Sequence, residues 1–187
     1  MLTDGADEDG VIQVPECVRM ALAALARQID ALDAGIETID KEFAAEARAD
    51  EKARRPMSIP EIGPVTASAI AATVPDGSAF ASGRAFSAFL GLTPRQHSSG
   101  GKERLGRITK MGDRSMRRLL VAGATAALHH ATGHNDPLRR WARQMLERKG
   151  GQSGFKLTAG ALANILARIV FAVLRSGEFY DDRPVAA

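Results

Sequence analysis

Apolar residues recur at alternating steps of four and three near the start of the chain, and this repeat constrains the fold more than any other feature. Its positions are Val18, Leu22, Leu25, Ile29, Leu32, Ile36, Ile39 and Phe43. The spacing places them on one narrow stripe of a helix, the a and d positions of a coiled coil. Isoleucines at two a positions, beside leucines at d positions, suit two strands. We expect residues 15–55 to form a coiled-coil dimerisation arm. The alternative is a helix that folds back onto its own domain.

The composition favours helices over a sheet in the rest of the chain. Aromatic residues make up only 5% of the sequence, whereas hydrophobic residues reach 45%, with alanine and leucine abundant. Such a set packs helices on helices and can furnish a core. The expected fold is mainly α, with a compact helical domain over residues 58–180 after the long helix. Residues 1–14 are acidic and should be disordered, and residues 181–187 should form a flexible tail.

The sequence indicates a soluble cytoplasmic protein. The single cysteine, Cys17, has no partner for an internal disulfide, which fits a reducing compartment. No apolar run approaches the ~18 residues that span a bilayer. The acidic start MLTDGADEDG is the opposite of a basic signal-peptide start. We therefore expect no membrane partner.

Charge is distributed unevenly, although the formal net charge is only +3. The first 50 residues hold four Lys or Arg against twelve Asp or Glu, whereas residues 94–118 hold eight against two. The eight are Arg95, Lys102, Arg104, Arg107, Lys110, Arg114, Arg117 and Arg118. Basic charge concentrated in this way is expected of a surface that binds nucleic-acid phosphates. A charge run alone is usually a solvated face, but glycines and serines are mixed into this one.

The basic Gly/Ser-rich stretch carries its own start and stop signals. Ser82 can cap a short helix that Gly91 ends, and Pro94 then commits the chain to an extended path. The segment LGRITK is expected to form a short strand or ribbon. Gly112 and Asp113 restart a helix whose first turns carry three arginines, where cations oppose the helix dipole. That arrangement is understandable if an anion binds between them.

A helix-hairpin-helix-like element is expected between the arm and the basic stretch. The Arg55-Pro56 pair should stop the first helix, and the turn IPEIG leads into a helix with Pro64 in its first turn. In that motif the turn usually reads IPGIG, and its backbone N–H groups bind a nucleic-acid phosphate. Glu61 stands in place of the first glycine, and a carboxylate weakens a phosphate contact. The turn is either a nucleic-acid contact or a packing element that has lost it, and both alternatives require Gly63.

No metal site is expected in this chain. His129 and His130 are adjacent, so on a helix they point about 100° apart and cannot both face one metal. His134 and Asp136 lie nearby, but the spacing matches no strong zinc motif. We expect these histidines to lie at the surface or at helix ends.

Five segments follow one another in an informative order: IPEIGPVTA, FASGRAFSAFLGLTP, SSGGK, ITKMGDRSMRRLL and an alanine-rich last helix that ends in RSGEFY. Together they resemble the C-terminal domain of the insertion-sequence one-hundred-and-ten family of transposases, from residue 58 to the C-terminus. The resemblance implies a bacterial enzyme that cuts and rejoins DNA as a dimer or tetramer and is guided by a bridge RNA. It also implies two catalytic parts, an N-terminal RuvC-like domain with four acidic metal ligands and a domain that contributes a nucleophilic serine.

The resemblance assigns the nucleophile to Ser99, which precedes Gly100 in the SSGGK run, and leaves Ser98 as a neighbour. The other matching positions are Gly91, Pro94, Lys102, Lys110, Gly112 and Arg117. Only about fourteen residues precede the arm, so we expect a truncated gene product or a fragment that lacks the RuvC-like domain. Mg²⁺ is expected only with that domain, and no cofactor is expected in this chain.

The chemistry of Ser99 leaves three functions open. A serine hydroxyl is a weak nucleophile, so attack on a phosphodiester requires cations that hold the phosphate and stabilise the developing charge. The chain can be the serine-bearing part of an RNA-guided DNA transposase, inactive in recombination by itself. It can be a nucleic-acid-binding module without chemistry. It can also be a dimerisation remnant that associates with full-length copies.

Overall fold

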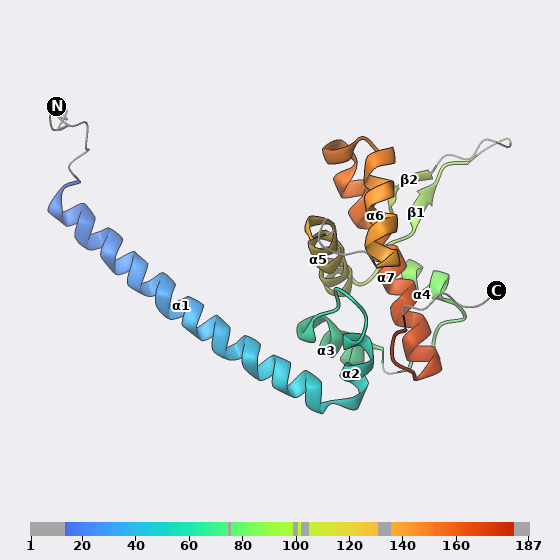
Figure 1. Cartoon of the computed structure of the whole chain (residues 1–187), viewed down its shortest axis with the longest axis horizontal. Helices are drawn as coiled ribbons and strands as arrows, with labels where there is room; N and C mark the ends of the chain where they lie inside the picture. The colour runs from blue at the N-terminus through green and yellow to red at the C-terminus, as the bar shows by residue number, and fades with distance from the viewer. Residues whose placement is uncertain (1–13, 75, 99–100, 102–104, 131–135, 182–187) are drawn as a thin grey trace. The chain divides into compact units, whose positions relative to one another are not determined.

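The computed structural model of the protein describes residues 14–74, 76–98, 101, 105–130 and 136–181. Its contacts divide the chain into two compact units, Met1–Phe43 and Ala44–Ala187 (Figure 1). The predictions of a disordered N-terminus and a flexible tail fall almost entirely outside the described residues.

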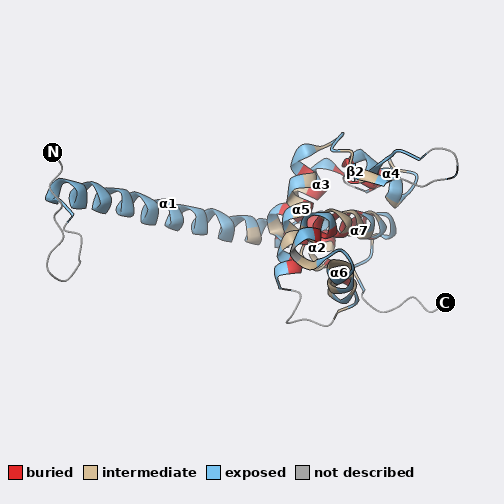
Figure 2. Ribbon diagram, turned by 90° about the horizontal axis from the view of Figure 1, so that it is seen from above, coloured by how far each residue is buried: buried red, intermediate tan, exposed pale blue. Residues whose placement is uncertain are grey.

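The first unit contains most of helix α1 (Glu16–Ala49). The last six residues of that helix, 44–49, belong to the second unit. Each apolar residue of the heptad stripe is exposed, from 42% for Val18 to 66% for Leu32. Figure 2 shows the exposed surface along this helix. The long helix predicted from the repeat is therefore present, with its apolar stripe facing solvent.

The end of α1 lies at Asp50 rather than at the Arg55-Pro56 pair where the sequence predicted it. The Asp50 carboxylate accepts a hydrogen bond from Lys52 N at 2.9 Å and caps a second helix, α2 (Glu51–Met57). Pro56 lies inside α2, in its last turn. It is tolerated there because it removes only one helical hydrogen bond so close to the end.

The turn of residues 58–63 joins α2 to α3 (Pro64–Thr73), and the two helices pack against each other. Gly63 is the N-cap of α3 and Pro64 lies in its first turn, as the sequence predicted. Apolar residues of the turn and of α3 are buried in the core; they include Ile59, Ile62, Ala67 and Ile70.

Helix α4 (Gly83–Phe89) has the start and stop that its sequence predicts. Ala85 N donates a hydrogen bond to Ser82 Oγ at 3.2 Å, which caps the helix. Gly91 follows the helix with a φ of +67°, a conformation that glycine adopts without strain. The chain is thereby turned toward the strands.

The predicted short ribbon consists of strands β1 (Pro94–Gln96) and β2 (Leu105–Ile108), which pair antiparallel. Pro94 begins β1 and lies opposite Ile108, with an irregularity in the register before Gln96. Ile108 is partly buried against the core, and its Cγ2 atom lies 3.8 Å from where a Cβ on Gly160 would be. The ribbon therefore packs on the final helix.

The remaining elements are α5 (Arg114–His129), α6 (Pro137–Arg148), the 3-10 turn η2 (Gly151–Gly154) and α7 (Phe155–Ser176). Helix α7 contacts α2, α4, α5 and α6, so it forms the centre of the domain. Its residues Leu162, Leu166 and Val170, spaced four apart, are fully buried. The prediction of a mainly α fold is confirmed.

Helix α7 is long and apolar enough to cross a membrane by length and composition alone, with a mean hydropathy of 2.0 over its most apolar window. The expectation that no such run exists is therefore wrong, because isolated charges such as Arg168 hardly interrupt it. Half of that window is buried inside the domain. This is also the pattern of a core helix, so composition alone is weak evidence for a membrane span.

Candidate nucleic-acid interface

Five of the eight predicted cations are exposed on consecutive elements of the domain. They are Arg95 on β1, Arg107 on β2, Lys110 before α5, and Arg114 and Arg118 on the first turns of α5. Four other predicted residues, Ser99, Gly100, Lys102 and Arg104, lie outside the described residues. Ser98 is described and exposed. The described part of the ribbon and the start of α5 thus carry a basic surface, which we call the ribbon–α5 surface.

Arg117, the eighth predicted cation, also makes contacts within the domain. Its side chain is half-buried, and its Nη1 donates to Leu90 O at 2.9 Å and to Asp113 O at 3.3 Å. These bonds satisfy a carbonyl at the C-terminus of α4, where a cation is favourable. Arg117 therefore joins α5 to α4, a role that the sequence did not suggest.

The turn of residues 110–112 is held by close backbone contacts to the end of α4. Lys110 N donates a hydrogen bond to Gly91 O at 3.0 Å. A Cβ on Gly91 would lie 2.6 Å from Met111 O. A Cβ on Gly112 would overlap the carbonyl oxygen of Phe89. Only glycine permits such an approach, and this gives a geometric reason for the two glycines that the sequence predicted to be structural.

The base of the ribbon is tied to this turn by two further bonds. Thr109 N donates to Thr93 O at 2.9 Å, which extends the strand pairing beyond β2. Arg95 Nη2 donates to Thr109 O at 3.4 Å, a long and weak bond. The Arg95 guanidinium therefore keeps most of its donors for other acceptors.

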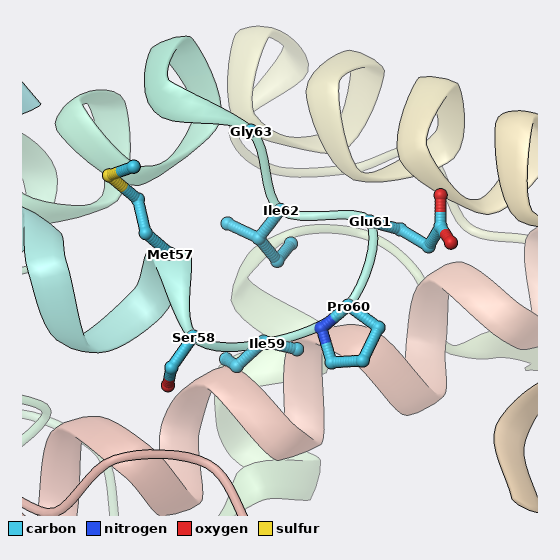
Figure 3. Close-up of a pocket in the computed structure, with 7 residues that line it drawn as sticks. All are labelled: Met57, Ser58, Ile59, Pro60, Glu61, Ile62 and Gly63. Atoms are coloured by element: carbon cyan, nitrogen blue, oxygen red, sulfur yellow. The ribbon is translucent and has the colours of Figure 1, made fainter. Parts of the chain in front are cut away.

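A second predicted contact, the turn of residues 58–63, lines a hollow of 480 Å³ together with Met57. Figure 3 shows the side chain of Glu61 pointing away from those of Met57 and Ile62. Gly63 is exposed, and no atom lies within 4 Å of the position of an added Cβ. The Glu61 carboxylate is thus directed away from the hollow, and the backbone of Gly63 at the start of α3 is accessible.

The Glu61 carboxylate is neutralised by Arg139 of α6. Arg139 Nη2 binds Glu61 Oε1, and Arg139 Nη1 binds Asp136 Oδ2 at 2.8 Å. The Glu61 and Arg139 side chains are only 12% and 15% exposed. A Cβ on Gly123 of α5 would lie 2.5 Å from Glu61 O, so the turn also touches α5. The sequence correctly identified Glu61 as unusual but did not reveal its partner.

Asp136 remains ionised within this cluster. Burial alone would raise its pKa, but hydrogen bonds from the backbone and the side chain of Arg139, together with the Arg139 charge, lower the pKa below its usual value of 3.8. The Arg139 guanidinium thus binds two carboxylates.

The C-terminal segment fastens the same turn from another side. Ser58 Oγ accepts a hydrogen bond from Tyr180 N at 2.8 Å and donates one to Arg55 O at 2.6 Å. The Arg54 guanidinium lies 6.0 Å from the centre of the Phe179 ring. The turn is therefore fixed by α5, α6 and residues that follow α7.

Exposed cations on α6 and at its C-terminus were not included among the predicted binding residues. They are Arg140 and Arg148 of the helix and Lys149, its C-cap. The basic composition of DPLRRWARQMLERK was the available signal.

The histidines were considered in the sequence as possible metal ligands. The centre of the His129 ring lies 5.0 Å from that of the Phe155 ring. No cluster of three potential metal ligands occurs within the described ranges.

Part of this chain is similar to transposases. The family model for "Transposase IS116/IS110/IS902 family" matches residues 53–140, which run from α2 into α6. This stretch of the chain belongs to that family.

The similar proteins are themselves named transposases. The chain is 41% identical over 168 residues to a putative transposase y4pF/y4sB of Sinorhizobium fredii, covering 89% of this chain and 42% of that protein. It is 40% identical over 153 residues to a probable family 20 transposase of Pseudomonas aeruginosa, covering 82% and 44%. It is 40% identical over 148 residues to the transposase for insertion sequence element IS1111A of Coxiella burnetii, covering 79% and 40%. The chain spans less than half the length of these relatives.

Proposed function

We propose that this chain is the C-terminal part of a DNA transposase and that it binds DNA through the ribbon–α5 surface. The observation that carries the proposal is the set of five exposed cations on two strands, the turn that follows them and the start of one helix, in a chain similar to this family. Binding of this kind is dominated by phosphate contacts and weakens steeply as the salt concentration rises. The chain then acts in the bacterial cytoplasm, where its DNA target is found.

The strand connection would deliver the nucleophile. We assign this role to Ser99 on the family resemblance, since Ser99 lies outside the described residues. The Ser99 oxygen bonds to phosphorus and the serine proton passes to a base. The bond from phosphorus to a sugar oxygen breaks, and that oxygen takes up a proton and leaves as a hydroxyl. The phosphoserine retains the energy of the phosphodiester, so rejoining needs no ATP. Arg95 and Arg107, on the strands that flank the connection, would hold the phosphate.

The acidic half of the chemistry is assigned to a RuvC-like domain of the full transposase. The family resemblance implies that any Mg²⁺ is held by that other domain, and we place the general base there as well. Target choice would come from base pairing with a bridge RNA, as the family resemblance implies.

The test is Ser99→Ala in this chain after fusion to the N-terminal half of a full-length relative. We expect strand exchange and the covalent protein–DNA product to be lost, while Ser98→Ala retains both. DNA binding by the unfused chain should be unchanged in either variant. Strand exchange that survives in Ser99→Ala would show that another group is the nucleophile. Normal binding with no exchange in any fusion favours a binding module without chemistry.

A dimeric arm is a second part of the proposal, because α1 exposes an uninterrupted apolar stripe. Two copies would bury these stripes against each other in a coiled coil. Ile29→Glu places a charge in the stripe, whereas Ala34→Glu places it on the opposite face. Sedimentation of the full chain at micromolar concentration should give a dimer for the parent and Ala34→Glu, and a monomer for Ile29→Glu. A monomeric parent would contradict the assignment.

A further inference from the structure

The side chain of Met111 is 73% exposed, more than any other large hydrophobic side chain in the described part of the chain. It lies in the 110–112 turn, between β2 and α5. The backbone of this turn is hydrogen-bonded to the end of α4, where Phe89 is itself 42% exposed. A large apolar side chain this exposed gains almost no stabilisation from burial in the core of its own domain. It is therefore available for a contact with a partner.

The backbone beneath Met111 is rigid. The residues on either side of it have positive φ values, +57° for Lys110 and +132° for Gly112. Asp113 N donates to Phe89 O at 3.3 Å, and an added Cβ on Gly91 would lie 2.6 Å from Met111 O. A left-handed lysine is strained by about 1 kcal/mol or more, so the surrounding contacts hold this conformation in place. Met111 is thus an apolar side chain on a fixed support.

The surroundings of Met111 are cationic. Lys110 precedes it, and Arg114 and Arg118 lie exposed on the first turns of α5. The carboxylate of the neighbouring Asp113 accepts a hydrogen bond from Met116 N at 2.8 Å and caps α5. A partner must therefore offer negative charge around an apolar, flat surface. Stacked bases within a phosphate backbone have this combination, and apolar side chains, methionine among them, insert between base pairs in other proteins.

We propose that Met111 inserts between adjacent base pairs of the bound DNA and partly unstacks them. This inference rests on the proposed DNA binding and adds to it a contact with bases. The phosphates on either side are bound by Lys110, Arg114 and Arg118. The fixed turn holds the Met111 side chain in position between the base pairs. Pyrimidine–purine steps such as TA unstack most easily, so they are the preferred position.

The experiment uses the full chain and a duplex of repeated TA steps in which one adenine is replaced by 2-aminopurine, whose fluorescence rises on unstacking. We expect the parent chain and Met111→Leu to raise the fluorescence. Met111→Ala should lose most of that rise and bind the duplex within about threefold of the parent, because phosphate contacts supply most of the affinity. Met20→Ala, which removes an exposed methionine from α1 outside the heptad stripe, should behave as the parent.

Thermal unfolding of each variant confirms that it is folded, which is expected because Met111 is exposed. Equal fluorescence for the parent and Met111→Ala would overturn the inference. A parent that binds the duplex with the expected salt dependence but raises no fluorescence would overturn it too, and would leave the proposed DNA binding intact. A parent that does not bind DNA at low salt would instead overturn the proposed function.

Discussion

The turns of residues 58–63 and 110–112 stabilise the same left-handed backbone conformation by different contacts. Each contains a non-glycine residue in the left-handed region, Glu61 with φ of +68° and Lys110 with φ of +57°. Glu61 is held from its side chain, through a nearly buried ion pair with Arg139. Lys110 is held from its backbone, through contacts that only glycine neighbours allow, and its own side chain is exposed.

The difference shows that a left-handed residue can have a structural role in one turn and present its side chain to solvent in another. In the 58–63 turn the Glu61 carboxylate is paired with Arg139, so the turn packs on α5 and α6. In the 110–112 turn the contacts of Lys110 within the described part of the chain are made by its backbone. Its exposed side chain can therefore reach a ligand. Left-handed residues that are held in place cluster where function needs fixed geometry, but the side chain decides whether a turn is structural or available.

The largest effect should come from Gly112→Ala. The new Cβ would overlap the carbonyl oxygen of Phe89 and would be strained at a φ of +132°, so the free energy of unfolding should fall by about 3 kcal/mol or more. Urea unfolding of the full chain measures this. Gly160→Ala is the matched control, since its Cβ meets Ile108 Cγ2 at 3.8 Å, an ordinary contact. If both variants unfold alike, the 110–112 turn is not held by its backbone.

Arg139→Met should cause the next largest loss of stability, and this loss should come from the 58–63 turn and the start of α6 rather than from the 110–112 turn. It leaves two carboxylates, those of Glu61 and Asp136, without their cation in a poorly solvated place, and we expect a loss of about 2 to 3 kcal/mol. Arg140→Met changes the exposed neighbour and should stay within about 0.5 kcal/mol. Chemical denaturation that finds the two variants equal would show that the ion pair does not hold the turn.

Replacing each strained residue by glycine should separate the two turns by sign. Lys110→Gly removes left-handed strain without breaking a described side-chain contact and should be neutral or stabilising by up to about 1 kcal/mol. Glu61→Gly relieves the same strain but removes one of the two carboxylates that bind the nearly buried Arg139 guanidinium, so it should be destabilising. Differential scanning calorimetry gives both values.

DNA titrations add a second measure of the Lys110→Gly variant. If Lys110 contacts a phosphate, the slope of log affinity against log salt should decrease by about 1 in magnitude. Glu61→Gly should leave that slope unchanged, because Glu61 faces Arg139 rather than solvent. The comparison of the two turns is wrong if the variants exchange these behaviours.

The smallest effect is a pH dependence at the N-terminus of α6, where Asp136 shares Arg139 with Glu61 of the 58–63 turn. The pKa of Asp136 is lowered in the folded chain, so its contribution to stability is complete well above 3.8 and is lost as the pH falls through that value toward the folded-state pKa. Asp136→Asn keeps a capping side chain but cannot titrate. Between about pH 5 and pH 3, the parent should lose more stability than this variant. Parallel curves would contradict the assignment.

Local signals in the sequence predicted much of the fold. The heptad repeat predicted α1, the Ser82 and Gly91 signals predicted α4, and LGRITK predicted β2. These succeed because caps and periodicity act over a few residues. The end of α1 was misplaced because the sequence offered two signals, Asp50 and Pro56. In the structure Asp50 caps α2, and Pro56 lies inside that helix.

Long-range contacts could not be predicted in the same way. Glu61 and Arg139 are 78 residues apart, so nothing local links the unusual residue in the turn to the cation that neutralises it. Arg117 was predicted to be one cation among eight, yet its bond to Leu90 O depends on how α5 packs on α4. The basic stretch predicted which surface is charged, and packing decides which of those charges are free.

The central position of α7 has a consequence for how the protein is made. The helices that precede α7 cover a hydrophobic core whose main component is synthesised after them, and Tyr180 binds Ser58 across 122 residues of chain. During translation, α2 to α5 therefore emerge before the central helix, so the apolar faces that pack on α7 stay exposed. We expect the domain to stay unfolded on the ribosome until α7 has left the exit tunnel, and to depend on chaperones during that interval.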